Sequence, residues 1–77
     1  ETNISFFLKE ATDVSIEVYD LRGRLVKSLS DGEREAGLHS VVWNGVEQNG
    51  GSLPSGIYFY SISTDQKTFT KKMVLSK

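Results

Sequence analysis

The chain has 77 residues, of which 38% are hydrophobic, and it contains no cysteine. A chain of this length makes one domain that needs nearly every large apolar side chain for its core, so little room remains for a water-excluded active site. Nine lysines and arginines stand against ten acidic residues, which argues against nucleic acid as a partner, and the lack of cysteine excludes disulfides, thiolate zinc sites and a cysteine nucleophile.

The first part of the chain alternates apolar and polar side chains with a period of two, which is typical of half-buried β-strands. Two strands are predicted, at Thr2–Leu8 and Val14–Tyr19. A tight turn follows over 20–23. Its Asp20 side chain accepts hydrogen bonds from the backbone two residues on, and Gly23 supplies a positive φ. These features predict a hairpin.

The strand that returns from this turn is predicted at Arg24–Ser30. Its alternation is imperfect, because Val26 and Leu29 can share the buried face only if the strand contains a bulge, and we therefore expect one. Residues 31–37 are polar and charged, and they read as a surface loop.

The rest of the chain has three more strand signals, and no segment shows sustained helical periodicity. Between two of them lies a long loop over 44–56, which holds four of the seven glycines and the only proline. The Asn49-Gly50 pair in this loop favours a minor hairpin. Short antiparallel strands bury their faces only as two packed sheets, so the fold class is all-β and the architecture an antiparallel β-sandwich of about seven short strands. The three strands are predicted at 38–43, 56–64 and 68–76.

Residues that could carry chemistry are few and scattered. His39 is the only histidine, and no acidic residue or serine is placed beside it to orient it as a general base, so we expect a histidine at a strand surface or rim. The carboxylates of Asp20, Glu33, Glu35 and Glu47 lack the spacing of a calcium loop. We therefore expect no catalytic residue, no metal site and no cofactor.

The glycine-rich loop over 48–52 is not a phosphate cradle, because no Lys-Ser/Thr pair and no helix follow it. Aromatic residues are the remaining candidates, since ring faces with polar ends can stack on sugars. Core packing is favoured for the set as a whole, with Tyr58 and Tyr60 inside beside Trp43. That leaves Phe59 and Tyr19 as the rings that could bind a carbohydrate.

Four segments occur in an order that resembles a known family: Val18–Val26, Gly37–Gly45, Leu53–Tyr60 and Lys72–Leu75. Together they resemble the C-terminal sorting domains (type A) of the type IX secretion system. They equally resemble the related immunoglobulin-like domain of flagellar hook-capping, FlgD-like proteins. Both resemblances imply an immunoglobulin-like form of the sandwich. Sorting domains often open with a Pro-Asn-Pro motif, and this chain starts at Glu1 without it.

The sorting-domain resemblance implies that residues 1–77 are a single non-catalytic C-terminal module, excised from a longer bacterial protein. Its partners would be the secretion machinery at the outer membrane and a covalently linked upstream cargo domain. Nucleic acid, membrane insertion and a small-molecule substrate are not expected. The protein would be secreted or held at the cell surface, by way of the periplasm and the outer membrane.

In that family sorting depends on a short basic and apolar ending, which here is the run from Lys71 to Lys77. A terminal strand with an unpaired edge could add to a partner's sheet, with lysines that limit indiscriminate pairing. Recognition is therefore predicted at Lys71, Lys72, Met73, Val74 and Leu75. Two alternatives remain: a structural FlgD-like accessory module that spaces, stabilises or oligomerises a neighbouring domain, and a carbohydrate-binding module that uses Phe59 and Tyr19.

Overall fold

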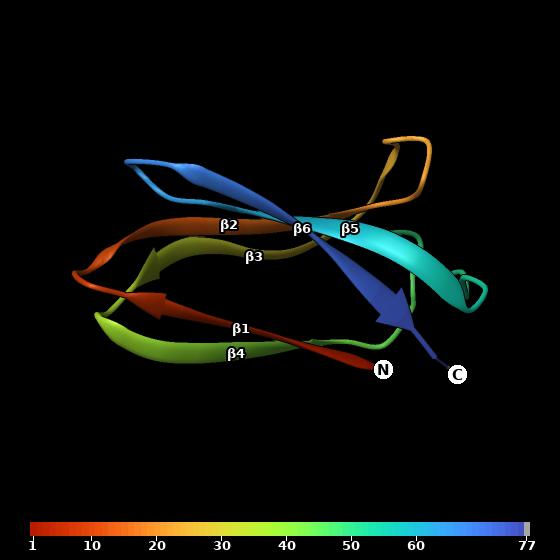
Figure 1. Cartoon of the computed structure of the whole chain (residues 1–77), viewed down its shortest axis with the longest axis horizontal. Coiled ribbons are helices and arrows are strands. Elements are labelled where there is room, and N and C mark those ends of the chain that lie inside the picture. The colour runs from red at the N-terminus through yellow and green to blue at the C-terminus, as the bar shows by residue number, and fades with distance from the viewer. Residues whose placement is uncertain (77) are drawn as a thin grey trace.

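The computed structural model describes residues 1–76, which form two layers of β-strands without a helix (Figure 1). One layer is the two-stranded sheet β1–β4, and the other is a four-stranded sheet in the order β3-β2-β5-β6. Every neighbouring pair is antiparallel. The predicted antiparallel β-sandwich is confirmed, with six strands instead of about seven. They are β1 (Thr2–Leu8), β2 (Thr12–Tyr19), β3 (Leu25–Arg34), β4 (Gly37–Trp43), β5 (Gly56–Ser63) and β6 (Thr68–Leu75).

The hydrophobic core lies between the two sheets. Trp43, the largest fully buried side chain, comes from β4, and Ile4 faces the core from β1. Since strand side chains alternate between faces, every second residue of each strand reaches this layer. The predicted core positions Ile16, Val18, Trp43 and Tyr58 are all buried, and Tyr60 packs against them half-buried.

Two bulges place the apolar residues of β3. In the register with β2, Leu29 and Val26 are the two residues of β3 that have no cross-strand partner. Each bulge shifts the alternation by one residue, so Val26 is buried, Leu29 packs against the core and Leu25 turns outward. The predicted bulge is confirmed, and the structure adds a second.

The prediction of a surface loop over 31–37 is wrong. The strand β3 continues through Arg34 because Asp31–Arg34 pair with Thr12–Ser15, and β2 correspondingly starts at Thr12 instead of Val14. These polar residues belong to an edge strand, whose side chains can stay solvated while the backbone is paired. Only residues 35 and 36 then separate β3 from β4 in the other sheet.

The long loop between β4 and β5 folds back on itself and covers the edge of β3. Its Val46 and Ser52 form an isolated bridge around Asn49-Gly50, where Gly50 has a φ of 91°, which agrees with the predicted minor hairpin. The backbone N–H of Gln48 donates to the Val26 carbonyl (2.7 Å), and its side-chain Oε1 accepts from the Ser28 N–H (3.0 Å). Gln48 therefore satisfies backbone groups that an edge strand would leave free.

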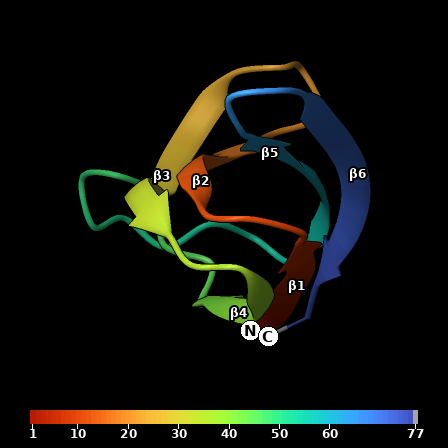
Figure 2. The same ribbon diagram turned by 90° about the vertical axis from the view of Figure 1, so that its left-hand side faces the viewer.

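The last strand brings the two chain ends together. Seen along the sheets, β6 stays paired with β5 and curves downward until its end lies beside β1 (Figure 2). There the Thr2 hydroxyl donates to the Val74 carbonyl (2.8 Å), and the Glu1 amino group donates to the Ser76 carbonyl (3.2 Å). We call the boundary between β1 and β6 the β1–β6 seam. In residues 1–76 no helix has the length and apolar character that a membrane crossing needs.

Candidate functional site

The residues predicted to carry recognition lie on two sides of β6. Met73 and Leu75 are buried, with 7% and 1% of their surface exposed, and they pack in the core. Lys72 and Val74 point to the opposite side, away from the core, while Lys71 lies on the side of Met73 but is exposed. The five residues therefore do not make one surface. Lys77, the end of the predicted signal, lies outside the described residues.

The solvent side of the four-stranded sheet carries an apolar surface at the end where β6 finishes. Cross-strand register joins its members: Leu25 pairs with Tyr19, Tyr19 with Phe59, and Ile57 with Val74. Val74 is 63% exposed, Leu25 49% and Ile57 40%, while the two aromatic rings are half-buried. We call these five residues the outer apolar face. Contiguous exposed apolar surface of this kind marks interaction sites on soluble domains.

Polar groups stand at the borders of the outer apolar face. On β2, the Tyr19 hydroxyl donates a hydrogen bond to the Glu17 carboxylate (3.1 Å). This bond, with some burial, raises the pKa of Tyr19 above its ordinary value, so the phenol stays neutral near pH 7. On β6, Lys72 is the cross-strand neighbour of Phe59. An apolar centre with polar borders is the usual composition of a protein interface.

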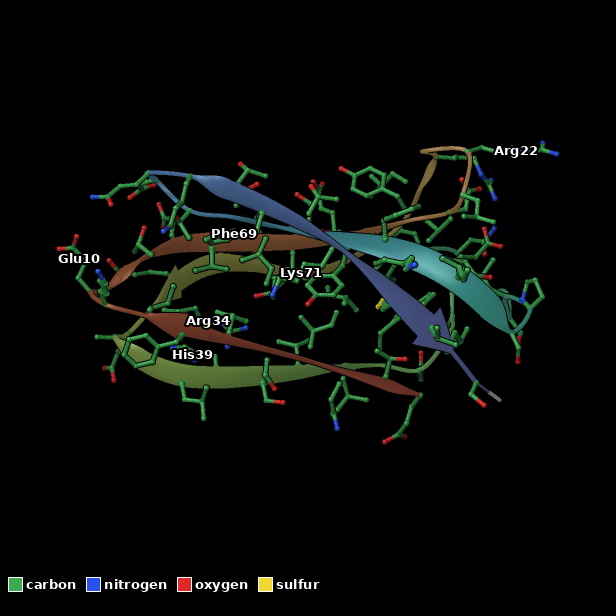
Figure 3. The ribbon with its side chains drawn as sticks, in the orientation of Figure 1. Glu10, Arg22, Arg34, His39, Phe69 and Lys71 are labelled. Carbon is green, nitrogen blue, oxygen red and sulfur yellow. The ribbon has the colours of Figure 1, made fainter. Side chains whose placement is uncertain are left out.

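The turn between β2 and β3 lies at the same end of the sheet. Its Asp20 carboxylate accepts hydrogen bonds from the backbone N–H groups of Arg22 (2.9 Å) and Arg24 (3.0 Å), and from the Arg24 guanidinium (3.2 Å). These donors hold the pKa of Asp20 below its usual range. Gly23 has a φ of 84°, as predicted for this turn. Asp20 therefore acts as the turn's cap, while Arg22 extends into solvent at its tip (Figure 3).

The predicted placement of the aromatic residues is largely confirmed. Trp43 and Tyr58 meet in the core, and Tyr60 is half-buried beside them. The two rings left as carbohydrate candidates, Tyr19 and Phe59, are direct cross-strand neighbours. They belong to the outer apolar face, whose aliphatic members Leu25 and Ile57 sequence reasoning did not include. The exposure of Leu25 could have been inferred from the predicted bulge, because the bulge turns Leu25 away from the core.

His39 and the carboxylates do not converge on a reactive centre. The His39 ring stacks on Phe6 with centroids 5.4 Å apart, and its Nε2 lies 2.7 Å from the Glu35 carbonyl oxygen. This is a rim position with a backbone partner, as predicted. Across residues 1–76 no three histidine, aspartate or glutamate side chains are grouped so that they could hold a metal ion.

Six strands in two layers, with an apolar solvent face, define an immunoglobulin-like β-sandwich module. The chain belongs to the FlgD Ig-like domain family, which it matches over residues 1–68. It is 36% identical over 53 residues to the basal-body rod modification protein FlgD of Salmonella typhimurium, a match that covers 69% of this chain and 23% of that protein. The Escherichia coli FlgD is 37% identical over 57 residues, which cover 73% of this chain and 25% of that protein.

A solved structure agrees with this family. The FlgD from P. aeruginosa superposes with a TM-score of 0.75 and 30% identity, over 95% of this chain and 58% of that chain. The chain spans about a quarter of the length of the curated relatives it matches. The resemblance to FlgD-like domains is therefore confirmed.

The comparisons do not support the other resemblance, to type IX sorting domains. The predicted localisation, secretion to the medium or cell surface through a type IX system, is contradicted, because the matching relatives are basal-body rod modification proteins. The segments that the two families share explain the error. They lie in the turn after β2, around Trp43 and at the start of β5, where they form turns and core contacts of the sandwich, so they indicate a fold and not its use.

Proposed function

We propose that the chain is a non-catalytic structural module of a FlgD-type assembly, and that it holds a neighbouring protein domain against its outer apolar face. The observation that carries the proposal is that face: three aliphatic side chains, Leu25, Ile57 and Val74, stand exposed around two aromatic rings. Apolar side chains at the centre of an interface supply most of the binding free energy, and their burial removes them from water.

The geometry of the face supports a protein partner in preference to a small molecule. The five side chains come from all four strands of the sheet and lie on its solvent side, with Leu25 at one edge and Val74 at the other. Small-molecule sites are concave and enclose their ligand, whereas protein interfaces are broad and have an apolar centre. A broad apolar sheet face therefore fits a second protein surface.

A chimera tests the structural role. The matching segment of the Salmonella typhimurium FlgD is replaced by this chain, and flagella are counted in electron micrographs of cells that lack their own FlgD. Assembly close to that of cells with intact FlgD is expected. A chimera that is folded and present at normal levels, yet supports no flagella, would contradict the proposal.

Charged substitutions on the outer apolar face then test the surface. In the same chimera, Ile57→Lys and Val74→Lys together are expected to reduce assembly at least about tenfold, since they place two hydrated cations on the apolar surface that the interface would bury. The matched control is Leu38→Lys. Leu38 is 77% exposed on the solvent side of the other sheet, so its substitution should leave assembly unchanged. Equal loss in both variants would assign the effect to general surface charge and contradict the role of this face.

A further inference from the structure

The β1–β6 seam is closed at one end only. In the sheet pairing, β1 bonds only to β4 and β6 only to β5, so each strand keeps one unpaired edge. Hydrogen bonds between the two segments are present where Glu1 and Thr2 meet Val74 and Ser76. Toward the start of β6 the strands diverge (Figure 2). Backbone groups on both edges are therefore free along this part of the seam.

An apolar groove of about 220 Å³ occupies the open part of the seam. Phe69 of β6 shares its side of the sheet with its partner Ile62, yet Phe69 is 45% exposed and Ile62 only 5%. Phe69 lines the open groove between β6 and β1, so part of its ring stays in contact with solvent. Phe7, on the β1 side of the groove, is 68% exposed. The groove is lined by Ser5, Phe6, Phe7, Tyr60, Ile62, Phe69 and Lys71.

The opposite side of the sandwich is covered by the chain itself. There Gln48 bonds to the edge of β3, and β3 passes into β4 through two residues. The free edge of β1 has no such cover and no protection of its own, since Thr2–Leu8 contains neither a charged residue nor a proline. Exposed edge strands without these features pair readily with another chain.

The charge along the groove is positive. Lys71 is the one charged residue among those that line it, and its side chain extends from β6 toward β1 (Figure 3). The amino group of Lys67 lies 4.8 Å above the Phe69 ring. Within residues 1–76 the ion pair that the structure contains joins Arg24 to Asp20, so neither lysine has an acidic partner there. A ligand with a carboxylate would supply one.

We propose that the β1–β6 seam binds an extended segment of a partner protein, which adds a strand to the free edge of β1. The segment places an apolar side chain between Phe7 and Phe69 and a carboxylate beside Lys71. Main-chain hydrogen bonds give such strand addition its affinity, and pockets for alternate side chains give it specificity. The proposal does not depend on the outer apolar face, which lies on the other side of the four-stranded sheet.

The test uses a capped peptide of eight residues, the length of β6, in which valine alternates with threonine and one central position is glutamate. It is titrated into the full chain, and backbone amide signals are followed by nuclear magnetic resonance. We expect a dissociation constant below about 1 mM, with shifted signals at Ser5, Phe6 and Phe7 and slower hydrogen exchange at those amides of β1 that point to its free edge. The same peptide with lysine for glutamate should bind at least about tenfold more weakly.

Matched variants assign the binding to the groove. Lys71→Glu should reverse the preference between the two peptides, whereas Lys72→Glu, one residue along but on the opposite face, should leave the preference unchanged. Phe7→Lys should abolish binding. Its control is Leu38→Lys, because Leu38 is the cross-strand partner of Phe7 and is exposed to a similar degree, but does not line the groove. All four side chains are exposed, so each variant should retain the fold, which a thermal unfolding curve verifies.

Three outcomes would overturn the proposal. One is a failure of the glutamate peptide to bind in this range. Another is binding that shifts signals on the outer apolar face and leaves β1 unaffected. The third is dimerisation of the chain itself, detected by sedimentation and lost in Phe7→Lys, which would assign the seam to a second copy. None of these results bears on the chimera, so the failure of one proposal is distinguishable from failure of the other.

Discussion

The indole ring of Trp43 meets the phenol ring of Tyr58 edge-on, with centroids 5.0 Å apart and an interplanar angle of 76°. One ring comes from the two-stranded sheet and the other from the four-stranded sheet. The Trp43 Nε1–H donates to the Val46 carbonyl (3.1 Å), and the Tyr58 hydroxyl donates to the Pro54 carbonyl (2.7 Å). The pair therefore joins the two layers and also holds the long loop near both of its ends.

Removing the Tyr58 hydroxyl should release one end of this loop. Tyr58→Phe is expected to lower the free energy of unfolding by about 1 kcal/mol, because the Pro54 carbonyl loses its donor while the ring contact with Trp43 remains. Tyr58→Leu should cost about 2 kcal/mol or more, since the ring contact is lost as well. Urea unfolding at neutral pH measures both. If Tyr58→Phe were as stable as the natural chain, the hydroxyl would have no structural role.

The Asp20 turn should make the stability of the fold depend on pH in the acidic range. The pKa of Asp20 in the folded chain lies below the ordinary value of 3.8 because the N–H groups of Arg24 and Arg22, and the Arg24 guanidinium, bind the carboxylate. A folded pKa below the unfolded one stabilises the fold above the unfolded pKa, and this contribution is lost as pH falls through the folded pKa. Asp20→Asn keeps an acceptor oxygen without the charge.

Thermal unfolding of the two proteins at a series of pH values tests this prediction. The melting temperature of the natural chain should exceed that of Asp20→Asn by a constant amount above about pH 5, and the gap should narrow below about pH 4. Other carboxylates titrate in both proteins, so the difference between the two curves reports on Asp20. A gap independent of pH would mean that the charge contributes nothing to the turn.

Gln48 should protect the edge of β3. In Gln48→Leu the Ser28 N–H loses its acceptor, and its hydrogen exchange should become about tenfold faster, in line with the loss of one hydrogen bond. Gln48→Glu keeps an oxygen at this position and should retain the protection. The exchange of the Ile16 amide in the centre of β2 serves as internal reference. Equal protection of Ser28 in all three proteins would show that the side chain does not cap this edge.

The same substitution should destabilise the fold strongly at one residue of β6 and hardly at all at its neighbour. Met73→Asp is expected to cost about 3 kcal/mol or more, because aspartate is too short to bring its charge from this buried position to water. Val74→Asp, with a side chain 63% exposed, should change the free energy of unfolding by about 0.5 kcal/mol or less. Circular dichroism during urea unfolding compares them. Similar losses would contradict the assignment of these residues to opposite faces.

The bulge in β3 is an example of a feature that the local sequence pattern predicts. Simple alternation cannot place both Val26 and Leu29 on the buried face, so a bulge was predicted from the local sequence. The structure confirms this bulge. The turn at Asp20 and Gly23 was likewise predictable, because its hydrogen bonds and its positive φ involve only residues that are close in sequence. The same holds for the alternation of β6, which separates Met73 from Val74.

Features that depend on distant partners were not predictable in this way. The extension of β3 through Arg34 follows from its pairing with the start of β2, since polar residues 31–34 have no strand signal of their own. The exposure of Phe69 also depends on a distant strand: alternation predicts an inward side chain, but the divergence of β1 leaves that side chain uncovered.

The sequence by itself determined where the apolar part of each strand lies, which side of it is apolar and where the tight turn falls, because these properties have a period of two or span a few residues. Only the tertiary structure decided which strand edges are paired and which are free. Strand pairing joins residues as far apart in the sequence as Thr2 and Trp43, and its free energy depends on the whole sandwich instead of any one segment. The outer apolar face and the β1–β6 seam therefore became visible only when the six strands were assembled.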